Sequence, residues 1–308
     1  MRFVLFSGAL GILACGVEAS DPMQPSERQG LAASMTAEAP SFILGDDSAD
    51  DQATSAGLRQ SEASKCVPKF AGIVRDFKSS HPDFQSFSGA SVSQGMVKSL
   101  LGADRKPVYN NTHQYIRNHE GERAYFHPRY SQQTTSDSNF AEWYNDVDDV
   151  NLSYEFELPL QQLENDRYVF DSSAFFPIDA VGWAALEGDS EQDNAGVRRN
   201  FWFTFELHTE VSYAGGEVFL FSGDDDLWVF INGKLALDLG GVHPPVDGKL
   251  DLDAMAGELG LKRGQSYPLD LFHAERRAKG SNFRVETSLQ FTNCEPIFVD
   301  PPPTRLAR

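Results

Sequence analysis

The chain has 308 residues, 41% of them hydrophobic, so it can bury the core of one large or two ordinary domains. Its 26 Lys and Arg residues against 45 Asp and Glu residues give a formal charge of -19, which a nucleic-acid backbone or an anionic membrane surface would repel. We therefore expect no nucleic-acid partner. The 12% aromatic residues, with 25 Gly and 16 Pro, favour a β-rich domain with many turns over a helical bundle.

The N-terminus has the pattern of a secretory signal. A charged Met-Arg start precedes an apolar run over residues 3–14, and we predict a signal peptide over residues 1–20. Two processing sites remain open: small residues at 17–19 suit an ordinary signal peptidase, whereas residues 12–16 resemble a bacterial lipobox that would lipidate Cys15. Either site predicts an extracellular or cell-surface protein, which contacts a membrane only if Cys15 carries a lipid anchor.

The rest of the chain divides by composition. Residues 21–65 are rich in Ser, Ala, Gln and acidic residues, which predicts a disordered acidic linker, either a tether or a propeptide. An ordered domain follows over 66–294, and the Pro-rich tail 295–308 should run extended over the surface or hang free. Cys66 and Cys294 lie at the two edges of this domain. In an exported protein they most simply form a disulfide worth about 4–5 kcal/mol, two free thiols being the alternative.

The predicted elements of the domain differ between its two halves. Residues 66–187 have short apolar runs and many turn residues, with brief helical signals at 93–101 and 140–144, so we expect a loop-rich half. Apolar alternation and turn signals then predict strands at 201–208, 217–222, 227–231, 234–239, 267–274 and 283–291. The Asn232-Gly233 pair predicts a tight hairpin. Short consecutive strands without βαβ alternation indicate an all-β fold, an antiparallel sandwich or barrel with loop-rich insertions and short helices.

One dense motif carries a resemblance to a known family. It is Phe-Ser-Gly-Asp-Asp-Asp-Leu-Trp-Val-Phe-Ile-Asn-Gly-Lys at residues 221–234, continued by Leu-Asp-Leu-Gly-Gly-Val-His at 237–243. Supporting motifs are Arg-Asp-Phe at 75–77, Phe-Phe-Pro-Ile-Asp at 175–179 and Phe-His-Ala-Glu-Arg at 272–276. The sequence resembles the fibro-slime domain, related to the PA14 β-barrel family of secreted adhesins, matrix proteins and some glycosidases, over about residues 66–294. The resemblance implies one PA14-like domain.

The resemblance also implies a calcium site in the acidic triplet. In PA14 lectins of the yeast flocculin type, two aspartates joined by a cis peptide bind Ca²⁺, which in turn ligates sugar hydroxyls; these positions correspond to Asp224 and Asp225. Asp226 stands where glycine is usual, and a loop near the domain end supplies an Asn at the position of Asn282. Adjacent carboxylates repel one another and favour a hard cation, so we predict Asp224, Asp225, Asp226 and Asn282 as ligands. A solvated acidic turn is the alternative.

Three further residues are predicted to contact a ligand, namely Trp228, His243 and Asn232. Trp228 follows the carboxylates and either stacks on a sugar ring or lies in the core. His243 follows the hairpin and either lines the site or hydrogen-bonds the turn. We expect Glu275 and Arg276 of the closing motif to form an internal ion pair rather than an acid/base pair.

The sequence offers no catalytic constellation. It has no nucleophile with its base, no paired zinc ligands and no Gly-rich phosphate loop in a structural context that would support one. We therefore predict a non-catalytic extracellular module for calcium-dependent carbohydrate binding or adhesion. The alternative is a structural component of an extracellular matrix or slime that binds protein partners without sugar. Glycans or matrix components are the expected partners, and chelator-sensitive glycan binding would distinguish the two functions.

Overall fold

The computed structural model describes the backbone and side chains of residues 70–87, 92–110, 133–293 and 295–300, and the backbone of three short strands outside these ranges. All of them belong to the compact unit Ser61–Arg308. The predicted signal peptide, linker, lipidation at Cys15 and disulfide between Cys66 and Cys294 lie outside the described residues.

An eight-stranded sheet forms the larger layer of the domain. Its strands are β1 (Phe70–Phe77), β4 (Asn151–Leu158), β9 (Phe203–Tyr213), β11 (Asp226–Ile231), β12 (Lys234–Leu239), β14 (Gln265–Glu275), β16 (Gln290–Phe291) and β17 (Thr304–Arg305). They are ordered β12-β11-β14-β9-β1-β4-β17, with β16 beside β9. Within this sheet β17 pairs parallel to β4 and the other pairs are antiparallel.

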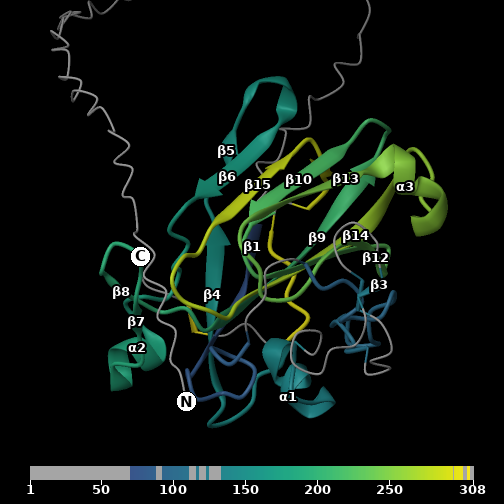
Figure 1. Cartoon of the computed structure of the whole chain (residues 1–308). Helices are drawn as coiled ribbons and strands as arrows, with labels where there is room; N and C mark the ends of the chain where they lie inside the picture. Colours follow the sequence, from purple (N-terminus) through teal and green to yellow (C-terminus); the bar gives the residue numbers. More distant parts are fainter. Residues whose placement is uncertain are drawn as a thin grey trace, which may run out of the picture. The chain divides into compact units, whose positions relative to one another are not determined.

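A five-stranded sheet forms the second layer (Figure 1). Its strands are β5 (Gln161–Gln162), β6 (Tyr168–Ser172), β10 (Val218–Gly223), β13 (Val246–Asp251) and β15 (Phe283–Thr287), in the order β13-β10-β15-β6-β5. Two small hairpins stand apart, β2 (Ile116–Arg117) with β3 (Arg123–Ala124) and β7 (Glu191–Gln192) with β8 (Arg198–Arg199). The helices are short: α1 (Asp137–Ala141), η1 (Glu142–Tyr144), η2 (Glu164–Asp166), α2 (Gly182–Glu187) and α3 (Leu252–Leu259).

The main hydrophobic core lies between the two sheets. Phe203 on β9 of the large sheet and Phe221 and Phe283 on the small one are all buried in it, and the rings of Phe221 and Phe283 lie 5.3 Å apart, edge to face. Alternate residues of each strand supply these inward side chains. The mostly antiparallel, all-β fold predicted from the sequence is confirmed, as two packed sheets rather than a closed barrel.

A second core covers the opposite face of the large sheet. Trp228 and Phe272 of the sheet pack against Trp143 and Tyr144 of η1, with 6.4 Å between the two Trp ring centroids and 5.0 Å between those of Tyr144 and Phe272. The large sheet is thus buried on both faces where these loops cover it. For this reason the polar face of the alternating segment 201–208 lies beneath loops and not in solvent.

Of the two helical segments predicted in the loop-rich first half, one is present in the structure and the other is not. The signal at 140–144 corresponds to α1 and η1, whereas 93–101 forms isolated bridges and turns instead of a helix. There Gly95 adopts a left-handed φ of 90° and donates its N–H to the Asp238 carboxylate at 2.7 Å, so a tertiary contact overrides the local helical pattern. The predicted hairpin is confirmed, since Asn232 and Gly233 join β11 to β12 with φ values of 55° and 71°.

Candidate functional site

The acidic triplet connects β10 to β11 at one end of the sandwich, where the loops after β12 and β14 also meet. These segments line an open cavity of about 170 Å³. Its wall carries three carboxylates, those of Asp224, Asp225 and Glu275, and two cationic side chains, Arg277 and Lys279. A small polar ligand would therefore meet groups of both charges.

Asp224 is oriented by Asn282. The Asn282 backbone N–H donates to Asp224 Oδ1 at 2.5 Å and its side-chain Nδ2 donates to Oδ2 at 2.9 Å. The segments around Gly223 and Asn282 approach closely because Gly223 has no side chain: a Cβ there would lie 2.5 Å from the Asn282 carbonyl oxygen. The structure thus brings together two of the predicted site residues, with Asn282 acting as a hydrogen-bond donor to the carboxylate.

Asp225 is buried in a strained backbone conformation. Its φ of 58° is uncommon for a residue other than glycine, and its Oδ2 accepts the Arg276 backbone N–H at 2.7 Å. Burial raises the pKa of Asp225 to about 7; the Arg276 charge opposes the rise, and the Asp226 and Asp224 charges add to it. Among the described residues no peptide bond is cis, so the Asp224–Asp225 bond is trans, unlike the flocculin pattern.

Asp226, which the sequence predicts as a metal ligand, forms a buried ion pair in the structure. Arg276 Nε donates to Asp226 Oδ2 at 2.6 Å, both side chains are fully buried, and the Gly241 N–H donates to Oδ1 at 2.5 Å. The guanidinium also donates to the Gln133 carbonyl at 2.7 Å and lies 4.6 Å from the Trp143 ring centroid. Both carboxylate oxygens of Asp226 are thus occupied by protein donors.

Glu275 lines the cavity and does not pair with Arg276, contrary to the sequence prediction. Consecutive strand residues point to opposite faces, so these two side chains diverge at the end of β14. Glu275 is 1% exposed, its Oε1 accepts the Arg277 N–H at 3.3 Å, the Ser281 side chain also stabilises its carboxylate, and its Oε2 has no hydrogen-bond partner within 3.5 Å among the described residues. Burial, then the charges of Asp225 and Asp224, hold its pKa well above the usual range. The closing motif signalled this residue, but sequence reasoning did not assign it to the site.

Of the three residues predicted to contact a ligand, two lie away from the cavity and one lines it. Trp228 is fully buried in the second core and its Nε1 donates to Asp238 Oδ1 at 3.0 Å, so it is closed to a ligand. Asn232 sits in the turn at the far end of β11 and donates to the Leu259 carbonyl at 2.9 Å. His243 lines the cavity, but its ring nitrogens lie 2.8 Å and 3.1 Å from two backbone carbonyl oxygens, which gives it a structural role in the loop.

The cavity carries the type of ligand atoms that a hard cation prefers, but these atoms are not arranged around one metal position. Carboxylate oxygens such as those of Asp224, Asp225 and Glu275 are the ligands that Ca²⁺ prefers. In the part of the chain that the structure describes, no three His, Cys, Asp or Glu side chains are arranged to hold a metal ion together. No helix within that part is long and apolar enough to span a bilayer.

Comparison with solved structures finds PA14 domains at low similarity. The PA14 domain of the MpAFP antifreeze protein is 11% identical with a TM-score of 0.28, over 82% of this chain and 93% of that one. A PA14 sugar-binding domain from an RTX adhesin is 12% identical with a TM-score of 0.26, over 44% and 77%. These scores are low, so the assignment to a family depends on the sequence matches.

The sequence matches are stronger. Residues 185–304 match the family model of the PA14 domain. The chain is 36% identical over 246 residues to Protein psiR and 35% identical over 234 residues to Protein psiF, both of Dictyostelium discoideum. These matches cover 76% and 68% of this chain but only 22% and 30% of the relatives, so the chain spans a minor part of their length. Residues 185–304 of the chain therefore match a PA14 domain, as the motif around the acidic triplet predicts.

Proposed function

We propose that this PA14 domain is a non-catalytic extracellular module that binds carbohydrate, and that its ligand site is the cavity beside Asp225 and Glu275. The observation that carries the proposal is Glu275 Oε2, a buried oxygen without a hydrogen-bond partner among the described residues, at the wall of that cavity. An unsatisfied buried polar group costs about 1–3 kcal/mol, so such groups normally have a partner such as an ion, a water or a ligand.

The proposal includes a Ca²⁺ ion at this cavity with Asp224, Asp225 and Glu275 as its ligands, whose side chains would have to move together to hold it because they are not arranged as a metal site in this structure. Three carboxylates near one cavity, two of them with raised pKa values, form a site whose mutual repulsion a divalent cation would relieve. When bound, Ca²⁺ supplies coordination positions that sugar hydroxyls can fill. Asn282 would orient Asp224 through its two donors, and Asp226 would stay paired with Arg276.

A second candidate function is a structural matrix or slime component that binds protein partners. The buried ion pair of Asp226 and Arg276 favours it, because this pair gives one member of the acidic triplet a purely structural role. In this function the triplet stiffens the β10–β11 connection, and no sugar is bound.

The test uses the full chain and isosteric neutral variants. We expect calorimetric titration to show Ca²⁺ binding, with a stabilisation of about 2.7 kcal/mol at 100 times Kd. The double variant Asp225→Asn/Glu275→Gln should lose this binding, together with any chelator-sensitive binding to a glycan array. The matched control is Asp247→Asn, which removes an exposed carboxylate of β13 and should bind like the wild type.

The outcomes separate the components of the proposal. Glycan binding that withstands chelator would keep the sugar site and reject the calcium. Retained Ca²⁺ affinity in the double variant would move the metal elsewhere in the chain. Absence of all glycan binding, together with self-association or binding to matrix protein, would favour the structural function.

A further inference from the structure

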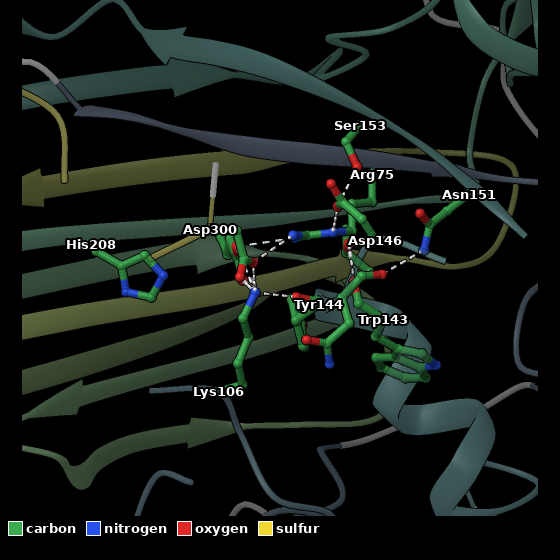
Figure 2. A network of polar contacts seen from close by, with 12 residues as sticks. Arg75, Lys106, Trp143, Tyr144, Asp146, Asn151, Ser153, His208 and Asp300 are labelled. Atoms are coloured by element: carbon green, nitrogen blue, oxygen red, sulfur yellow. Dashed lines mark hydrogen bonds and ion pairs between the residues drawn. The ribbon is translucent and has the colours of Figure 1, made fainter. Parts of the chain in front are cut away.

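A buried cluster of charged residues lies on the outer face of the large sheet, apart from the cavity described above. Figure 2 shows its central members, among them Arg75 of β1, Lys106 of the loop region that follows β1, and Asp300 of the C-terminal segment. Arg75 and Glu206 are fully buried, and Lys106 is 3% exposed. Two cations are therefore enclosed in the protein and need carboxylate partners.

The strands and loops supply only part of that negative charge. Glu206 is shared, since its Oε1 lies 3.1 Å from Arg75 Nη1 and 3.1 Å from Lys106 Nζ. Asp146 accepts from Arg75 Nε at 2.8 Å, but its side chain is 52% exposed. Lys106 Nζ also donates to the Tyr144 carbonyl oxygen. Two buried cations thus share one fully buried carboxylate.

Asp300 supplies the missing carboxylate. Its Oδ2 lies 2.5 Å from Lys106 Nζ and 3.4 Å from Arg75 Nη2, and the side chain is only 34% exposed (Figure 2). Three residues earlier, Ile297 forms an isolated antiparallel bridge with His208 of β9. The segment 295–300, which the sequence predicts to run extended or to hang free, is therefore attached to the sheet at two points.

We propose that Arg75 and Lys106 form a carboxylate-binding site whose occupant is Asp300 of the chain's own C-terminal segment, and that this contact holds residues 295–300 as a strap against the large sheet. Charge-assisted hydrogen bonds are about twice as strong as neutral ones, and at 295–300 the Asp300 carboxylate is the charged group that reaches the buried cations.

Hydrogen exchange of the full-length chain tests the strap. In Asp300→Asn we expect amides of 295–300 to exchange at least about tenfold faster, since a hydrogen bond to a charged group contributes about 1.5–3 kcal/mol. Exchange in β11 and β14 should stay unchanged. Asp300→Glu, which keeps the carboxylate, should restore most of the protection, and Asp247→Asn should behave like the wild type. Unchanged exchange at 295–300 in Asp300→Asn, or faster exchange spread evenly over the domain, would overturn the proposal.

A double-mutant cycle identifies the receptor of the strap. In a Lys106→Met background, Asp300→Asn should accelerate exchange at 295–300 much less than it does in the wild type, because the main partner of the carboxylate is gone. Equal effects in both backgrounds would show that Lys106 is not the receptor and would reject the assigned site. If Lys106→Met does not fold, the comparison of Asp300→Asn with Asp300→Glu decides the question.

Discussion

Arg276 is the residue on which the acidic triplet depends most. It neutralises Asp226 in a fully buried pair and donates to the carbonyl oxygens of Asp83 and Gln133, so it ties two loops to the start of β11. We expect Arg276→Met to destabilise the protein by about 3–5 kcal/mol, because it leaves the buried Asp226 carboxylate without a counter-ion. Urea unfolding measures this loss.

A second substitution tests whether the unpaired charge of Asp226 is what destabilises Arg276→Met. If the uncompensated charge is what destabilises Arg276→Met, then adding Asp226→Asn should recover part of the lost stability. The exposed neighbour Arg277 is the control, and Arg277→Met should change the free energy of unfolding by less than about 1 kcal/mol. A double variant with the same stability as Arg276→Met would point instead to the packing of the guanidinium against Trp143.

At the scale of elements, the β11–β12 hairpin links the site to the far end of the sheet. Asn232→Ala removes the hydrogen bond to the Leu259 carbonyl and places alanine at a φ of 55°, so we expect a loss of about 1–2 kcal/mol in stability. Ligand binding at the cavity should not change, because the six-residue strand β11 separates Asn232 from Asp225 at about 3.3 Å per residue. Urea unfolding measures the expected loss of stability, and Ca²⁺ titration tests whether ligand binding is unchanged. Weaker Ca²⁺ binding at full occupancy of the folded state would restore the ligand role first predicted for Asn232.

Strands β9 to β12, β14 and β15 could be predicted because each carries its own signal, whereas β13 was not predicted. Regular alternation and the Asn232-Gly233 turn locate β11 and β12 to within a residue. Strands β1 and β4 carry no such signal. In β1 all eight residues are buried, including Arg75 and Asp76, because distant loops supply their partners. A local pattern cannot predict a strand whose charged residues are satisfied by tertiary contacts.

The site shows the same division between local and distant information. The triplet itself and the proximity of Asn282 to Asp224 follow from the family pattern. The partner of Asp226 does not, since Arg276 lies 50 positions away and was expected to pair with its neighbour Glu275. Glu275 is the last residue of β14 and Arg276 follows it directly, so the face on which each side chain lies depends on the register of that strand in the sheet.

At the scale of the whole molecule, burial of carboxylates makes stability depend on pH. Burial raises the pKa of Asp76 and Asp225 to about 7 and that of Asp238 to about 6, and it holds the pKa of Glu275 well above its usual range. Each of these groups binds its proton more tightly in the folded than in the unfolded chain. Their contribution to stability is therefore fully present below about pH 4, the pKa of an unfolded carboxyl group, and is lost as pH rises through about 7. His273, whose pKa burial lowers to about 3, opposes this trend only below its unfolded pKa of about 6.5.

We therefore expect the protein in chelating buffer to melt at a lower temperature at pH 8 than at pH 6.5. Asp76→Asn should reduce this difference, because it removes a carboxyl group whose pKa burial raises to about 7. Asp76 accepts from Asn200 at 2.7 Å and from the Trp183 N–H at 2.6 Å, and it lies apart from the candidate ligand cavity. The exposed Asp247→Asn should leave the difference unchanged. A melting temperature that rises from pH 6.5 to pH 8 in the wild type would show that these carboxylates ionise in the folded protein without penalty. In that case counter-charges, and not the burial of unpaired carboxylates, would govern the stability of this sandwich.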